Sequence, residues 1–159
     1  MQPAAGHSAN EAKADLAQLL GEAILSTRSD AIVAADREGI IRIWNPGAER
    51  VFGHTRDEAL GRTLDLIIPE RLRARHWEGF ARVVETGQSR YREDELLAVP
   101  AMRKNGTAIS VQFTIAPIRK SGQMIGMAAI IRDVTKQFQE TRELRRRLAE
   151  LQARIAGGS

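Results

Sequence analysis

One histidine of this 159-residue chain occupies a position where an imidazole can do chemistry. Residues 71–84, RLRARHWEGFARVV, have the spacing of an amphipathic helix. At about 100° per residue, His76 falls within the apolar arc and is predicted to point inward. The apolar residues of that arc are Leu72, Phe80 and Val83. A neutral imidazole there can ligate haem iron, or it can pack in the core with both nitrogens hydrogen-bonded.

Other candidate sites in the chain are weaker. There are no cysteines, which excludes disulfides, thiolate metal sites and cysteinyl flavin adducts. His7 and His54 lie far from His76 in sequence, so the short ligand spacing of a zinc site is missing. A non-covalent flavin would need amide and aromatic side chains around its ring. The candidates for that role are Gln112, Trp44 and Trp77.

Five strands are predicted around a helical middle. The apolar runs AIVAAD (31–36) and GIIRIWN (39–45) meet at a tight turn and indicate an antiparallel pair. Further along, AISVQFTIAPI (108–118) alternates apolar and polar residues, which predicts one buried and one wet strand face. The turn sequences RKNGT and RKSGQ flank that strand, so a further strand is expected before the RKNGT hairpin, and MIGMAAIIR (124–132) is the last of the five.

Helices are predicted before, between and after the strands. Residues 9–25 form an amphipathic helix behind a disordered tail at 1–8, and Asn10 is suited to cap it. Pro46 is suited to open a short helix that Gly53 closes. The main helix is predicted from Pro69 to Thr86, with Gly87 as its stop.

The C-terminal segment 136–156 has the pattern of a coiled coil, followed by a tail at 157–159. Apolar residues recur at spacings of four, three and four, and Phe138 is placed to begin the series. The four are Leu144, Leu148, Leu151 and Ile155. About two heptads are marginal for an isolated coil, so we expect a homodimer that also uses the N-terminal helix.

Composition bounds the class of protein. The length suits one domain with short extensions, and the net charge of +4 is a mild surplus. The densest basic cluster, RELRRRLAEL, is mixed with acids, so nucleic-acid binding is not expected. No apolar run reaches the roughly 18 residues that span a bilayer, and a signal-peptide core is missing, so we expect a cytoplasmic protein without a membrane anchor.

The combination of IIRIWNPGAERVFGHTRDEALGR, IPE, a long helix, RKNGT and IIRDVTKQ resembles a PAS domain of the bacterial signalling type over residues 25–136. The resemblance implies an α+β fold with a five-stranded antiparallel sheet and helices over one face. The PAS domain itself is expected at 26–135. It also implies a sensory module that is not an enzyme, with an output module in trans or in a longer chain. Asp133, Val134 and Thr135 match the junction through which such domains pass a signal to a C-terminal helix.

The helix sequence RARHWEGFAR also looks like the haem-binding PAS domain of rhizobial oxygen-sensing histidine kinases. That resemblance implies haem b with His76 as proximal iron ligand and Arg82 as propionate partner. Gly79 would leave room for the ring, and Phe80, Val111 and Phe113 would complete the pocket. Such relatives carry an oxygen-binding arginine where this chain has Leu97, so carbon monoxide, nitric oxide or redox state are better candidate signals than oxygen. The alternatives are a ligand-free dimerisation module and a domain that binds flavin or another small ligand.

Overall fold

The computed structural model describes residues 5–87 and 97–157, and it confirms the α+β class. Eleven helices and strands follow one another within these described ranges. The strands are β1 (Ala31–Asp36), β2 (Ile41–Trp44), β3 (Leu97–Met102), β4 (Ala108–Lys120) and β5 (Gln123–Asp133). The helices are α1 (Ala5–Leu25), α2 (Pro46–Phe52), α3 (Arg56–Ala59), the 3-10 turn η1 (Leu64–Leu66), α4 (Glu70–Thr86) and α5 (Thr135–Gly157).

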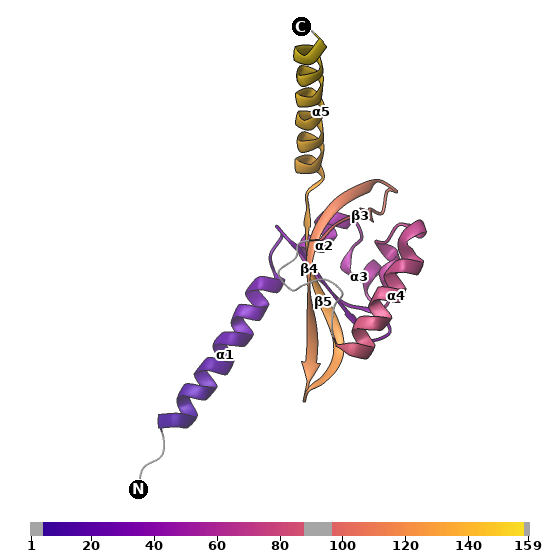
Figure 1. The fold of residues 1–159 in the computed structure, drawn as a ribbon. Coiled ribbons are helices and arrows are strands. Elements are labelled where there is room, and N and C mark those ends of the chain that lie inside the picture. The colour runs from indigo at the N-terminus through magenta and orange to yellow at the C-terminus, as the bar shows by residue number, and fades with distance from the viewer. Residues whose placement is uncertain (1–4, 88–96, 158–159) are drawn as a thin grey trace.

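The strands form one antiparallel sheet in the order β2-β1-β5-β4-β3 (Figure 1). The last strand of the chain, β5, is therefore the central one, and it pairs with β1 on one side and β4 on the other. The predicted hairpin at Gly106 joins β3 to β4, and the turn at Gly122 joins β4 to β5. Both glycines adopt positive φ, which the turns require.

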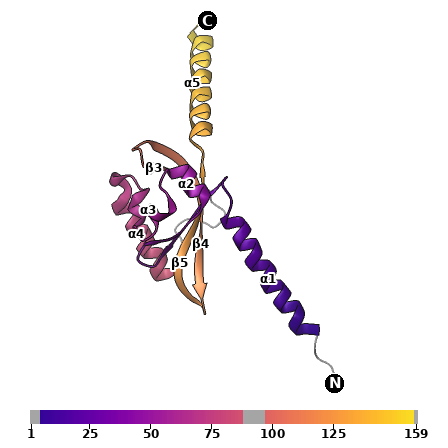
Figure 2. The ribbon, with the colours of Figure 1, turned by 180° about the vertical axis from the view of Figure 1, so that it is seen from behind.

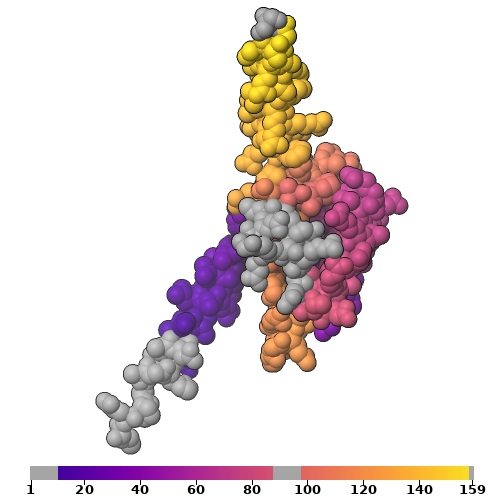
Figure 3. All heavy atoms as spheres, in the orientation of Figure 1, coloured from indigo at the N-terminus to yellow at the C-terminus, as the bar shows by residue number. Residues whose placement is uncertain are grey.

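The short helices and α4 cover one face of the sheet, whereas α1 and α5 leave the domain in different directions (Figures 1, 2 and 3). The first helix begins at Ala5, four residues before the predicted start at residue 9. The last helix agrees with the predicted 136–156 to within a residue at each end. Among the residues that the structure describes, no helix is both long and apolar enough to cross a membrane.

Asn45 fixes the join between the first strand pair and α2. Its side-chain oxygen accepts hydrogen bonds from the backbone N–H groups of Ile32 (2.7 Å) and Ala48 (2.8 Å), the second of which is the N-cap bond of α2. Its amide nitrogen donates to the carbonyl oxygens of Thr27 (3.0 Å) and Asp30 (3.1 Å). Pro46 then occupies the first turn of α2 and Gly53 ends it in the left-handed conformation, as the sequence predicts.

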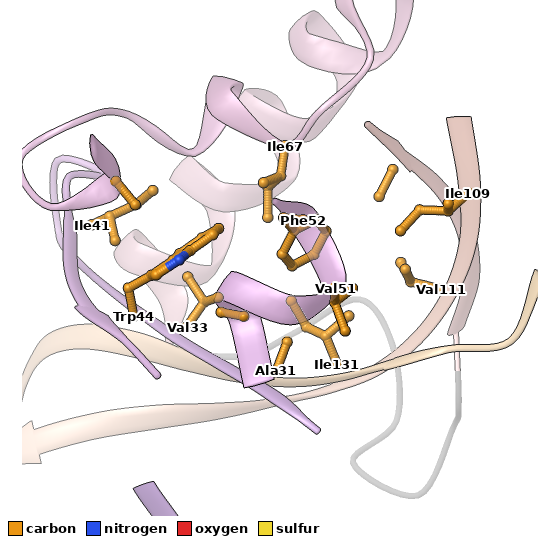
Figure 4. Packing of buried hydrophobic residues seen from close by; sticks show 13 residues of the cluster. Ala31, Val33, Ile41, Trp44, Val51, Phe52, Ile67, Ile109, Val111 and Ile131 are labelled. Carbon is orange, nitrogen blue, oxygen red and sulfur yellow. The ribbon is translucent and has the colours of Figure 1, made fainter. Parts of the chain in front are cut away.

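The main core lies between α2 and the inner face of the sheet (Figure 4). Phe52, Ile41 and Val51 are its largest fully buried side chains. A smaller cluster joins Phe80 and Val83 of α4 to Met124 and Met127 of β5. The space that carries the candidate site lies between these two clusters.

Replacing Asn45 by alanine is expected to lower the free energy of unfolding by about 3 kcal/mol, because the change leaves several buried backbone groups without partners. Urea unfolding measures this change. The matched control is Asn105→Ala, where the exposed side chain accepts a single bond from the Thr107 N–H group, and a loss below about 1 kcal/mol is expected. Equal losses in the two variants would contradict the role of Asn45.

Candidate functional site

A cavity of about 170 Å³ lies between α4 and the inner face of the sheet. Its wall is built by α2, the segment around η1, α4 and the strands β1, β3, β4 and β5. Every described residue of the lining except His76 is apolar, and Phe52, Val99 and Ile131 are representative. Such a space accepts hydrocarbon or a flat aromatic ring and offers one polar contact.

His76 supplies that polar contact. The residue is half-buried on α4, and its Nδ1 atom is buried with no hydrogen-bond partner among the described residues. Because more than nine in ten buried polar groups are hydrogen-bonded, an unpaired imidazole nitrogen is a specific feature of this cavity. Burial lowers the pKa of His76 below its ordinary value, although the Asp65 carboxylate acts in the opposite direction. The imidazole is therefore neutral near pH 7, the form that ligates metals.

Trp77 holds this part of α4 in place. Its indole Nε1–H donates a 2.8 Å hydrogen bond to Oδ1 of Asp65, the middle residue of η1. The ring lies over Gly39, where a Cβ atom would come within 2.3 Å of the indole. Its centroid is 5.0 Å from that of the His76 ring in an edge-on arrangement. Trp77 therefore has a structural role, and it does not line the cavity.

The structure brings together some of the predicted site residues and separates others. His76, Phe80, Val111 and Phe113 all line the cavity. Gly79 is not among the described lining residues, and a Cβ atom there would meet nothing within 4 Å.

Arg82 is not among the described lining residues, and its guanidinium pairs with Glu78 at 3.2 Å, one turn back on α4. The backbone of Leu97 pairs with Phe113, and its side chain falls outside the described residues.

The flavin candidates do not gather at the cavity. Trp44 donates to the His54 carbonyl oxygen and packs on Phe52, and Gln112 is absent from the lining.

Sequence reasoning missed several lining residues. Leu64 and Ile67 come from the segment before α4, which has no regular period to predict its inward side. Met127 and Ala129 come from β5, where the alternation that was used for β4 would have found them.

The junction between β5 and α5 is held by Asp133. Its Oδ2 atom accepts a 2.6 Å bond from Arg103, which follows β3, and Arg103 also donates to the Val51 carbonyl oxygen. Its Oδ1 atom accepts from the backbone N–H and the hydroxyl group of Thr135. Burial raises the pKa of Asp133, but the bonds from Thr135 and the Arg103 charge outweigh it and the pKa is lowered.

The residues present fit a haem in part. The neutral imidazole and the apolar wall suit an axial ligand and a flat ring. The described lining contains no cation for a propionate, and 170 Å³ is below the roughly 300–1,000 Å³ of small-molecule pockets. No group of three or more histidine, cysteine or acidic side chains is placed to hold a bare metal ion in the described part of the chain. The His76 imidazole therefore suits haem iron, whereas the cavity would have to widen to admit the haem ring.

The His76 ring should titrate below its ordinary pKa of 6.5. The proton-free form is favoured in the folded state, so His76 adds full stability above pH 6.5 and loses it as the pH falls from there toward the folded pKa. Proton–nitrogen NMR correlation of the ring measures the folded pKa, and His76→Phe identifies its signal. An imidazole signal that titrates above 6.5 would contradict the burial argument.

Comparison with known proteins adds the family. A family model described as "PAS fold" matches residues 25–139. The sensor protein FixL of Bradyrhizobium diazoefficiens is 30% identical over 139 residues, which is 83% of this chain and 25% of FixL. The oxygen sensor protein DosP of Escherichia coli is 29% identical over 107 residues, 65% of this chain and 13% of DosP. An uncharacterised protein of Azorhizobium caulinodans is 34% identical over 125 residues, 78% of this chain and 17% of that protein. The chain thus spans a quarter or less of these relatives.

Solved structures agree on the fold. The PAS domain of a Colwellia psychrerythraea protein superposes with a TM-score of 0.58 at 26% identity, covering 67% of this chain and 87% of that one. An RNA-binding light-oxygen-voltage receptor superposes with a TM-score of 0.65 at 23% identity, covering 90% and 39%. With the matched family model, these comparisons show that the chain belongs to the PAS-fold family.

Proposed function

We propose that this PAS sensory domain binds haem b in the cavity under α4, with His76 as the axial ligand. The observation that carries the proposal is the buried, unpaired Nδ1 atom of a neutral imidazole in an otherwise apolar cavity. The resemblance to FixL and to the oxygen sensor DosP supports it, since protein side chains alone do not bind diatomic gases. Bound haem would supply an iron centre whose gas ligation or oxidation state is the signal.

Entry of the ring requires α4 to move outward. The inner side of α4 is held by Phe80 and Val83 on Met124 and Met127, and by the bond from Trp77. Methionine side chains repack readily, so this contact can yield without breaking the main core. Arg82 would reach a propionate only by releasing Glu78, and that exposed ion pair is weak.

The proposed signal is carbon monoxide, nitric oxide or redox state. The described lining of the cavity contains no hydrogen-bond donor other than His76, so bound oxygen would lack the stabilising donor that an arginine supplies. The domain acts in this proposal as a sensor and not as an enzyme. Because the chain covers only part of its relatives, the output module is proposed to lie in trans or in a longer chain.

The proposed relay runs from the pocket to α5. Val99, Pro100 and Ala101 of β3 line the cavity, and Arg103 follows them and pairs with Asp133. A change in pocket width would shift this strand and alter the start of α5. In the proposed relay, the coiled-coil pairing of α5 differs between the ligand-bound and ligand-free states of the domain.

A second candidate function is a sensor or interaction module without haem. The cavity size favours it, because 170 Å³ suits a small apolar ligand or the domain's own side chains better than a macrocycle. The spectrum described next separates the two candidates.

Titration with hemin should give an intense Soret band in the wild-type chain and a much weaker, shifted band in His76→Ala, because the variant removes the axial ligand. The matched control is His54→Ala, whose ring packs near Trp44 and does not line the cavity, and this variant should keep the band. A colourless wild-type protein, or identical spectra for wild type and His76→Ala, would contradict haem binding and favour the second candidate.

We also propose a homodimer formed through α1 and α5. Both helices leave a stripe of large apolar side chains in solvent, with exposed fractions of 57% for Leu20 and 57% for Leu148. On the other side of α5, hydrogen bonds and charges from Arg146 and Arg147 lower the pKa of Glu143 to about 2, which marks a solvated face. One apolar and one charged face is the pattern of a two-stranded coil.

Leu148→Asp should convert the dimer to a monomer or raise its dissociation constant by at least roughly tenfold, because a carboxylate would be buried in the seam. Light scattering after size exclusion measures the mass. Ala149→Asp, at the exposed neighbouring position, is the control and should leave the mass unchanged. An unchanged mass in Leu148→Asp would place the interface elsewhere.

A further inference from the structure

The segment between α1 and β1 is fastened to the domain at several points. Arg50 of α2 donates to the carbonyl oxygens of Arg28 (2.7 Å) and Ser29 (2.6 Å). Asn45 holds the carbonyl oxygens of Thr27 and Asp30, as described above. The end of α1 is therefore not a free linker, although the helix itself projects away from the domain (Figure 1).

Asp30 extends this fastening to the neighbouring strand β5, where Arg132 lies opposite it beyond the Ala31–Ile131 pair. Its carboxylate accepts two hydrogen bonds from Arg132, with Nε–Oδ1 at 2.9 Å and the second contact at 3.1 Å. Such parallel bonds set the orientation of both groups. The Arg132 bond is the main reason that the pKa of Asp30 is lowered. Because Asp30 directly precedes β1 and Arg132 lies one residue before the end of β5, the pair joins the base of α1 to the base of α5.

Arg132 and Asp133 are consecutive residues with different partners. Arg132 pairs with Asp30 on the α1 side, whereas Asp133 pairs with Arg103, which follows the pocket strand β3. All four side chains line one open depression of about 580 Å³ at the base of α5. Two separate ion pairs thus meet at the start of the same helix.

We propose that α5 receives two inputs, one from the pocket through Arg103–Asp133 and a second, independent of any pocket ligand, from α1 through Asp30–Arg132. Movement of α1 would pull on the 27–30 segment, and the paired guanidinium would pass the displacement to the last residues of β5. The domain would then integrate a signal arriving along its N-terminal helix with the state of its cavity. This inference does not depend on haem.

The test is a double-mutant cycle read at the start of α5. Ala23→Pro breaks the last turn of α1, because proline removes a helix hydrogen bond. The substituted residue lies in α1, outside the domain itself. Amide hydrogen exchange is then followed by NMR at Val134, whose N–H bonds to the Ser110 carbonyl oxygen, and at Phe138, whose N–H bonds to the Val134 carbonyl oxygen. The cycle compares the effect of Ala23→Pro in the wild-type, Asp30→Asn and Arg132→Gln backgrounds.

In the wild-type background, Ala23→Pro should accelerate exchange at these amides by roughly twofold to fivefold, the range that an exposed ion pair can transmit. In the Asp30→Asn and Arg132→Gln backgrounds, Ala23→Pro should not accelerate exchange at these amides any further. The matched control is Arg103→Gln, which breaks the other ion pair and should leave the effect of Ala23→Pro intact. An equal acceleration with and without the Asp30–Arg132 pair, or none in the wild-type background, would overturn the proposal.

Discussion

The pairing of β5 with β1 and β4 is the interaction on which the rest of the structure depends. As the central strand, β5 closes the sheet between the N-terminal strand pair and the C-terminal hairpin. Its inward residues Met127 and Ile131 form part of the cavity wall, and its last residues carry the ion pairs at the base of α5. One continuous strand therefore connects the cavity wall to the start of α5, so a displacement of the wall can reach that helix directly.

The cavity combines two properties that oppose each other. The apolar walls keep the imidazole neutral, and they also leave its Nδ1 atom without a hydrogen-bond partner in the described part of the chain. A buried group in that state costs free energy, which a ligand bound to the nitrogen would recover. For this reason His76, and not one of the more exposed arginines of α4, is the proposed axial ligand.

Much of the fold was predictable from local signals. Pro46, Gly53 and Gly87 mark helix ends whose chemistry is local, and the alternation in residues 108–118 predicts which strand face is buried. The inward direction of His76 also followed from its helical spacing. The Glu78–Arg82 pair has the i,i+4 spacing that the sequence also shows, but the resemblance to haem-binding relatives assigned Arg82 to a propionate instead. The Asp30–Arg132 pair joins residues 102 positions apart, and only the sheet register brings them together.

Resonance Raman spectroscopy of the hemin-loaded, reduced chain directly tests whether His76 is bound to the haem iron. An iron–nitrogen stretching band that shifts when histidine is labelled with nitrogen-15, and that disappears in His76→Ala, would establish His76 as the axial ligand. A band that persists in His76→Ala, or a loaded protein without such a band, would show that His76 is not the axial ligand.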